Sequence, residues 1–157
     1  MAETQAENGI ILERYGKRPL AFLKELGYLE YEGIFAHGVE LNEREIAELT
    51  ASKIHIAHNP ISNLKLASGI APVTHLVQAG VTVGLATDSV ASNNNLDMFE
   101  ESRTAALLQK MRTGDATQFT IEQALKTMTI EGAKALGMDD QIGSLEVGKQ
   151  ANHSAKR

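Results

Sequence analysis

Three side chains suited to metal binding or proton transfer each follow a short apolar run of the chain: His37, His58 and Asp88. Short apolar runs bounded by polar residues are typical of buried strands in a parallel sheet. Open α/β folds and barrels build their sites at the carboxyl ends of such strands. Imidazoles and carboxylates can bind a divalent metal or act as general acids and bases. We therefore expect these three residues to meet at one edge of a sheet.

Each of the three also has a simpler interpretation. Asp88 would be partly desolvated after its strand, as a metal ligand or general base is, but it could equally cap a turn with Ser89. A single histidine at a strand end, such as His37 or His58, is more often a structural hydrogen-bond partner than a ligand. His55 lies three positions before His58, so we expect it to face the other side of the strand.

The remaining candidates are weaker when taken alone. Glu3 lies near the start of the chain, where an acid is ordinarily solvated. The polar stretch 62–65 could bind a substrate, cover a site or be a plain loop. The chain has no glycine-rich phosphate-binding motif and no Gly-x-Ser-x-Gly nucleophile motif. A small nucleotide-binding fold of the dinucleotide type is therefore disfavoured.

Composition narrows the class of protein. The chain has 157 residues, 43% of them hydrophobic and 22% charged, which is typical of one globular α/β domain. Its net charge is −5 and its basic residues are scattered, which disfavours nucleic-acid binding. There is no cysteine, so a metal site would need histidine and carboxylate ligands. No apolar run approaches a membrane span and no targeting signal is visible, so we expect a cytoplasmic protein without membrane contact.

The elements that must position the candidates alternate between strands and helices. We expect polar loops over residues 59–69 and 89–95, and a further short strand over 144–146. Strands that alternate with helices predict a parallel sheet with right-handed crossovers. Three such strands resemble a slice of a larger barrel. The expected strands are 33–36, 53–57 and 81–86, and the expected helices are 4–15, 19–26, 42–52, 72–79, 96–112, 121–127 and 130–136.

Several of these stretches together resemble the amidohydrolase superfamily, in the branch of 5-methylthioadenosine/S-adenosylhomocysteine deaminases and triazine chlorohydrolases. The resemblance covers nearly the whole chain, in the order that the family has. It is specific for the branch and weak for the substrate. The stretches are 2–4, 16–20, 36–39, 58–69, 87–88, 92–99, 132–137 and 143–149.

The resemblance implies a fold and a chemistry. It implies the last three or so βα units of a (β/α)8 (TIM) barrel with its C-terminal helices over residues 1–143. Residues 144–157 would begin a small β domain and end in a tail unlike the family. It also implies a divalent metal, usually zinc, that activates water. The activity would be deamination, or another hydrolysis of ring substituents, on a purine nucleoside or related heterocycle.

The resemblance also implies roles for single residues. Asp88 matches the aspartate that binds the metal and shuttles the proton of the water. Glu3 matches the acid that protonates the ring nitrogen of the substrate, and His37 matches the histidine that stabilises the tetrahedral adduct. Both Glu3 and His37 would also contact the substrate. The residues expected to line the site with them are His58, Asn59, Ser62 and Asn63.

The resemblance further implies three metal-binding histidines that this sequence does not contain, one placed directly before Met1 and two farther upstream. Only Asp88 remains of four expected ligands, so we expect a C-terminal fragment that is inactive alone. The alternative is a non-catalytic remnant, or a half-barrel that binds a complementary N-terminal half. The complete protein would bind a small heterocyclic molecule, and a homo-oligomer stays open.

Overall fold

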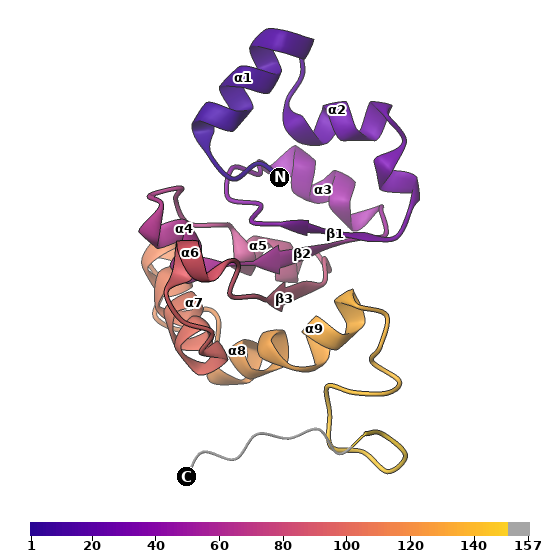
Figure 1. The fold of residues 1–157 in the computed structure, drawn as a ribbon, viewed down its shortest axis with the longest axis vertical. Helices are drawn as coiled ribbons and strands as arrows, with labels where there is room; N and C mark the ends of the chain where they lie inside the picture. Colours follow the sequence, from indigo (N-terminus) through magenta and orange to yellow (C-terminus); the bar gives the residue numbers. More distant parts are fainter. Residues whose placement is uncertain (151–157) are drawn as a thin grey trace.

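A three-stranded parallel sheet lies at the centre of the computed structural model, which describes residues 1–150 (Figure 1). The strands are β1 (Gly33–Ala36), β2 (Ile54–His58) and β3 (Val83–Leu85), and β2 lies between the other two. The parallel register pairs Ala36 with Ala57 and His58 with Leu85. The carboxyl ends of all three strands therefore lie at one edge of the sheet, and the predicted parallel α/β arrangement is confirmed.

Helices follow each strand and begin at recognisable caps. Thr4 caps α1, Asp97 caps α7, and Asn42 with Glu45 forms a capping box at α3. Each cap supplies a side-chain oxygen to amides that the helix cannot satisfy itself. The described helices are α1 (Gln5–Tyr15), α2 (Pro19–Glu25), the 3-10 helix η1 (Tyr28–Glu30), α3 (Glu43–Thr50), α4 (Pro60–Lys65), α5 (Val73–Gln78), α6 (Val90–Asn93), α7 (Met98–Thr113), α8 (Ile121–Met128) and α9 (Ile130–Ala135).

Burial alternates along the central strand, and this alternation separates the two faces of the sheet. Ile54, Ile56 and His58 of β2 are buried, whereas His55 and Ala57 between them are only partly buried. Successive side chains of a strand point to opposite faces, so one face carries the core and the other is more open. The apolar core also contains buried residues of α3 and α5: Ile46, Leu49, Val73 and Leu76.

The first residues of the chain run alongside the end of β1. The amino group of Met1 donates to the carbonyl of Ala36 at 3.1 Å, and the amide of Gly38 donates to the carbonyl of Met1 at 3.2 Å. The amide of Glu40 donates to the carbonyl of Ala2 at 2.9 Å, and Ala2 is fully buried. These backbone bonds place Glu3 at the same edge of the sheet as the carboxyl end of β1.

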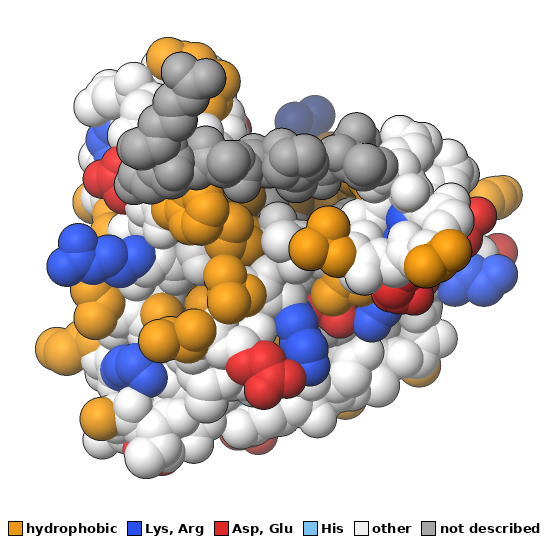
Figure 2. All heavy atoms as spheres, turned by 90° about the horizontal axis from the view of Figure 1, so that it is seen from below, with side chains coloured by type: hydrophobic (Ala, Val, Ile, Leu, Met, Phe, Trp, Pro, Cys, Tyr) orange, Lys and Arg blue, Asp and Glu red, His pale blue; other side chains and the backbone are white. Residues whose placement is uncertain are grey.

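Helices α8 and α9 carry apolar side chains outside the core as well as inside it. Ala124 and Ala133 are buried, whereas Ile121 of α8 is 80% exposed and Leu136, directly after α9, is 61% exposed. Figure 2 views the molecule from the side on which α8 and α9 lie in Figure 1, and it shows apolar side chains spread among charged ones. No helix within residues 1–150 has both the length and the apolar character needed to cross a bilayer.

The structure corrects several expected elements. The expected loop 59–69 contains α4, because Pro60 supplies the fixed φ that favours the first turn of a helix. The expected loop 89–95 contains α6, which begins after a Ser89 cap. Residues 144–146 do not form a strand; they lie in bends and irregular backbone. Strand β2 is shifted by one residue and β3 is shorter than expected, whereas the expected tail 151–157 lies outside the described residues.

Close packing of two glycines predicts a sharp difference between two alanine substitutions. A Cβ at Gly84 of β3 would lie 3.0 Å from the Cα of Gly132 in α9, whereas a Cβ at Gly132 would meet only the carbonyl of Thr127 at 3.8 Å. Backbone atoms cannot swing aside, so Gly84→Ala should lower the free energy of unfolding by about 1–3 kcal/mol. Gly132→Ala should leave it unchanged or raise it by up to about 1 kcal/mol. Urea unfolding measures both, and equal stabilities would contradict this packing.

Candidate functional site

Two of the candidate residues lie at the carboxyl edge of the sheet on strained backbone. His37 directly follows β1 with φ of 73°, and Asp88 follows β3 with φ of 60°. Ala2, beside Glu3, has φ of 48°. Non-glycine residues rarely adopt positive φ, and such strain concentrates at functional sites. The expectation that His37, His58 and Asp88 share one edge of the sheet is confirmed, and His58 is the last residue of β2.

Glu3 and His37 face each other across this edge. The Oε2 atom of Glu3 lies 3.7 Å from Nε2 of His37, and the side chains are 28% and 13% exposed. The hydroxyl of Ser68 donates to Oε1 of Glu3 at 3.0 Å and so fixes the carboxyl group. Residues 1–3 and the segment after β1 thus bring together an acid and an imidazole that are far apart in the sequence.

The other nitrogen of His37 is oriented by two buried amides. Nδ1 lies 2.9 Å from Oδ1 of Asn63 and 3.3 Å from Nδ2 of Asn59. Oδ1 of Asn63 can accept only from a protonated Nδ1, whereas Nδ2 of Asn59 can donate only to an unprotonated one, so the tautomer of His37 decides which of the two bonds forms. At 3.7 Å, Nε2 of His37 and the Glu3 carboxyl group lie close together without a direct hydrogen bond.

Asp88 is exposed, and hydroxyl groups hold it in its ionised form. Its Oδ2 accepts from Oγ of Ser62 at 2.6 Å and from Oγ of Ser92 at 3.0 Å. The bond from Ser62 is the largest cause and lowers the pKa of Asp88 from its usual value. Burial acts in the opposite direction, and Ser89, Ser92 and the nearby His37 lower the pKa further. Asp88 therefore presents a negative carboxylate to the edge at neutral pH.

His58 lies at the same edge but beneath its surface. The residue is 1% exposed, and neither ring nitrogen has a hydrogen-bond partner within residues 1–150. Burial, aided by the nearby His37, lowers the pKa of His58 to about 3. The imidazole is therefore neutral at physiological pH. Neither nitrogen makes the hydrogen bond that the structural interpretation of His58 expects within residues 1–150, and substrate contact by His58 stays a prediction.

The remaining predicted lining residues are buried as well. Asn59 is 2% exposed, Ser62 is fully buried and Asn63 is 1% exposed. They act on the exposed groups from below, because Asn59 and Asn63 contact His37 and Ser62 contacts Asp88. In this structure they are orienting partners of the edge. Direct contact of these three with a substrate remains a prediction.

The described residues contain no group of three or more metal-binding side chains within reach of one ion. Asp88 fits the part of a single anionic ligand, since it is ionised and exposed. One carboxylate does not make a closed zinc site, which needs three or four protein ligands. The 150 described residues therefore hold no cluster large enough to bind zinc unaided.

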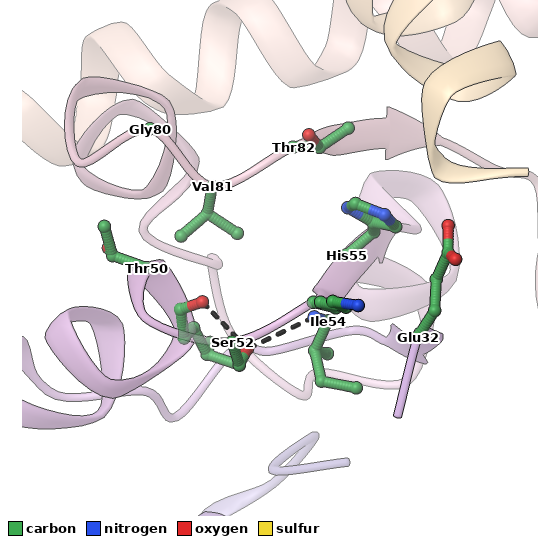
Figure 3. A pocket seen from close by; sticks show the side chains of 10 residues that line it. Glu32, Thr50, Ser52, Ile54, His55, Gly80, Val81 and Thr82 are labelled. Carbon is green, nitrogen blue, oxygen red and sulfur yellow. Dashed lines mark hydrogen bonds between the residues drawn. The ribbon is translucent and has the colours of Figure 1, made fainter. Parts of the chain in front are cut away.

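His55 lies at the opposite end of the sheet. It lines a hollow of about 390 Å³ at the amino ends of the strands, together with Glu32, Lys53 and Thr82 (Figure 3). The side chains of Glu32 and His55 lie next to each other there. None of the candidate residues of the carboxyl edge lines this hollow. The expectation that His55 points away from the candidate site is confirmed.

Two serines of the site were missed by sequence reasoning. Ser92 lies four residues after Asp88, a spacing that would bring the two together on a turn or helix, and this signal was available. Ser68 bonds Glu3 across 65 positions of sequence, and no local pattern points to it. Its contact depends on how α4 ends and on the docking of residues 1–3 against β1.

Comparison with known proteins gives consistent results. The model of the Amidohydrolase family matches residues 1–156. A 5-methylthioadenosine/S-adenosylhomocysteine deaminase of Moorella thermoacetica is 50% identical over 152 residues, which are 97% of this chain and 36% of that protein. One from Bacillus cereus is 52% identical over 97% of this chain and 35% of that protein. The chain spans about a third of the length of these relatives.

Solved structures agree with the sequence comparison. A zinc-bound adenosine deaminase from Xanthomonas campestris superposes with a TM-score of 0.93 and 46% identity, over 96% of this chain and 34% of that one. An atrazine chlorohydrolase from Arthrobacter aurescens, complexed with zinc and atraton, superposes with a TM-score of 0.85 and 30% identity, over 94% of this chain and 33% of that one. Both similarities cover nearly all of this chain.

The buried His58 predicts a specific pH dependence of stability. Its pKa is about 3 in the fold and about 6.5 in the unfolded chain, so only the unfolded chain binds a proton between these values. The free energy of unfolding should therefore fall as the pH drops below 6.5. Between pH 7.5 and 5.0 the wild type should lose about 2 kcal/mol more than His58→Gln.

Urea unfolding at both pH values measures this loss. His75→Gln, which changes an exposed histidine of α5, is the matched control. It should lose the same free energy of unfolding between the two pH values as the wild type. If His58→Gln and the wild type lost the same free energy of unfolding on acidification, the conclusion that the buried imidazole of His58 is neutral would be wrong.

Proposed function

This chain belongs to the amidohydrolase family, and from that premise we propose that it forms the last three βα units of a (β/α)8 barrel with the helices that follow. The support is the similarity over 97% of the chain to relatives about three times as long. The open face of the sheet and the exposed apolar residues of α8 and α9 suit packing against further barrel elements. We place this unit at residues 1–143, and residues 144–157 at the start of a small β domain.

We propose that the assembled barrel deaminates a purine nucleoside or a related heterocycle, as a hydrolase acting on carbon–nitrogen bonds other than peptide bonds. The observation that carries this proposal is the convergence of Glu3, His37 and Asp88 at the carboxyl edge of the sheet, with Glu3 3.7 Å from His37. The relatives are deaminases of 5-methylthioadenosine and S-adenosylhomocysteine by name, which supports an adenosine thioether as substrate.

The three residues suit three roles. A bound divalent metal, for which we propose zinc, would supply Lewis-acid activation of water. Asp88 is the ligand that we assign within the described part of the chain. Its carboxylate takes up the proton of the attacking water and passes it to the amino group, which leaves as ammonia when the C–N bond breaks. Glu3, which faces Nε2 of His37, protonates the ring nitrogen of the substrate. His37, whose Nδ1 lies against Asn59 and Asn63, donates a hydrogen bond from Nε2 to the adduct as charge develops on it.

We further propose that the 157 residues are inactive alone. The described part of the chain has no group of three metal-binding side chains, so the ligands that join Asp88 would come from the rest of the barrel. The edge strands β1 and β3 each have a single neighbour within residues 1–150, so each leaves an edge to which another strand can pair. The second candidate, a non-catalytic half-barrel that binds a complementary N-terminal half, rests on the same open edges.

The single ligand predicts weak metal binding by the isolated chain. One carboxylate cannot replace a shell of three or four ligands, so titration calorimetry with Zn²⁺ should show no tight stoichiometric site. Asp88→Asn should give the same heats as the wild type. A tight 1:1 site in the wild type that Asp88→Asn removes would show that this chain holds the metal unaided.

The proposed roles predict distinct effects in an assembled barrel. The chain is fused behind the preceding part of the Moorella thermoacetica deaminase, and ammonia release from 5-methylthioadenosine is measured with and without a chelator. Asp88→Asn should abolish turnover, because it removes both a ligand charge and the proton acceptor. Glu3→Gln should keep bound zinc and lose about 10²–10⁴-fold in kcat, because it removes only the proton donor.

Two further variants complete this experiment. His37→Asn should slow turnover while zinc content stays unchanged, because the substitution weakens only the stabilisation of the adduct. Glu13→Gln, at an exposed position of α1, should match the wild type. Full activity in Asp88→Asn, or turnover that ignores the chelator, would contradict the assigned roles.

A further inference from the structure

A buried carboxylate lies under the loop that carries Asp88. Glu101, in the first turn of α7, is fully buried. Burial raises the pKa of Glu101, while hydrogen bonds from Asn93 and Ile61 act in the opposite direction. A carboxylate removed from water is costly unless donors surround it. Its two oxygens find donors on two different segments of the chain.

The contacts of Glu101 reach both sides of the candidate site. Its Oε2 accepts from the backbone amide of Ile61 at 3.2 Å, at the start of α4. Its Oε1 accepts from Nδ2 of Asn93, in α6. The same Nδ2 of Asn93 donates to the carbonyl of Thr87 at 2.6 Å. Glu101 therefore bonds one segment directly and the other through Asn93.

These two segments carry Asp88 and its strongest donor. Thr87 directly precedes Asp88, and Ile61 directly precedes Ser62. The hydroxyl of Ser62 donates to Asp88 at 2.6 Å, so the hydrogen bonds connect the two segments a second time. The distance between Asp88 and Ser62 thus depends on where Glu101 holds the two backbones.

We propose that Glu101 is a positioning residue that holds Asp88 against Ser62 by anchoring the start of α4 and the loop after β3 to one buried carboxylate. This inference rests on the proposed role of Asp88 and deepens it. Both partners of Glu101 are N–H donors, which an ionised carboxylate with two acceptor oxygens matches. A glutamine in its place offers one acceptor and turns its NH₂ group toward the other donor. Glu101→Gln keeps the volume and breaks one of the two anchors.

The test uses the 157-residue chain labelled with ¹³C and ¹⁵N, at pH 7 and without metal. In Glu101→Gln, hydrogen exchange of the Ile61 amide should accelerate about tenfold or more, as expected for loss of one buried bond. The side-chain carboxyl ¹³C resonance of Asp88 should shift, because its contact with Ser62 loosens. The matched control is Glu100→Gln, an exposed neighbour that accepts from Asn95 at 2.7 Å, and it should change neither signal.

A second variant separates positioning from simple support of the fold. Asn93→Ser removes the bonds from Asn93 to Glu101 and to Thr87 and leaves the bond from Ile61 to Glu101, so the Asp88 resonance should shift while the Ile61 amide stays protected. If Glu101→Gln does not fold, Asn93→Ser decides alone. A folded Glu101→Gln with an unchanged Asp88 resonance would overturn the proposal, as would an Asn93→Ser variant whose Asp88 resonance is unchanged.

Hydrogen exchange and the Asp88 resonance are measured without turnover. The positioning proposal can therefore be refuted separately from the proposed reaction. An inactive fused barrel combined with a shifted Asp88 resonance would refute the proposed reaction and leave the positioning role standing. An active barrel in which Glu101→Gln leaves the Asp88 resonance and kcat unchanged would refute the positioning role alone.

Discussion

The parallel pairing of β2 with both of its neighbours is the constraint on which the rest of the structure depends. Because all three strands run the same way, every chain segment that leaves their carboxyl ends emerges at one edge. His37 follows β1 and Asp88 follows β3 at this edge. The end of β2 is followed closely by α4, which contains Ser62. An antiparallel partner on either side would have sent one of these groups to the opposite edge, where His55 lies.

Hydrogen bonds from buried polar groups turn this convergence into a defined geometry. Asn63 fixes the ring of His37, Ser62 fixes the carboxylate of Asp88, and Ser68 fixes Glu3. All three partners are buried, so they keep their places by packing and cannot rotate freely as surface side chains do. Preorganised partners of this kind remove the reorganisation that a reacting site would otherwise require. The buried side chains of Ser62, Asn63 and Ser68 thus support the edge from below.

Much of the fold could be predicted from local pattern, and much of the site could not. Strand β1 and helix α3 follow from an apolar run and from the capping box of Asn42 and Glu45, which are local signals. Helix α4 was missed because its polar residues show no apolar period, and their burial comes from contacts with His37 and Asp88 far away in sequence. The place of Glu3 depends on backbone bonds of Met1 and Ala2 to β1 and its following turn. Long-range contacts of this kind leave no trace in a local window.

The carboxyl groups of Asp88 and Glu101 lie near each other, yet their pKa values are shifted in opposite directions. Asp88 is exposed and accepts hydrogen bonds from Ser62 and Ser92. These bonds lower its pKa and keep its carboxylate ionised. Glu101 is buried, so its pKa is raised although Asn93 and Ile61 donate to it. The exposed group is the one that can meet a cation or a proton, because only it reaches the surface. The buried group has no access to a substrate, so its charge can act only through the segments it bonds. We propose that the chemistry and its positioning are thereby divided between Asp88 in the loop after β3 and Glu101 in α7.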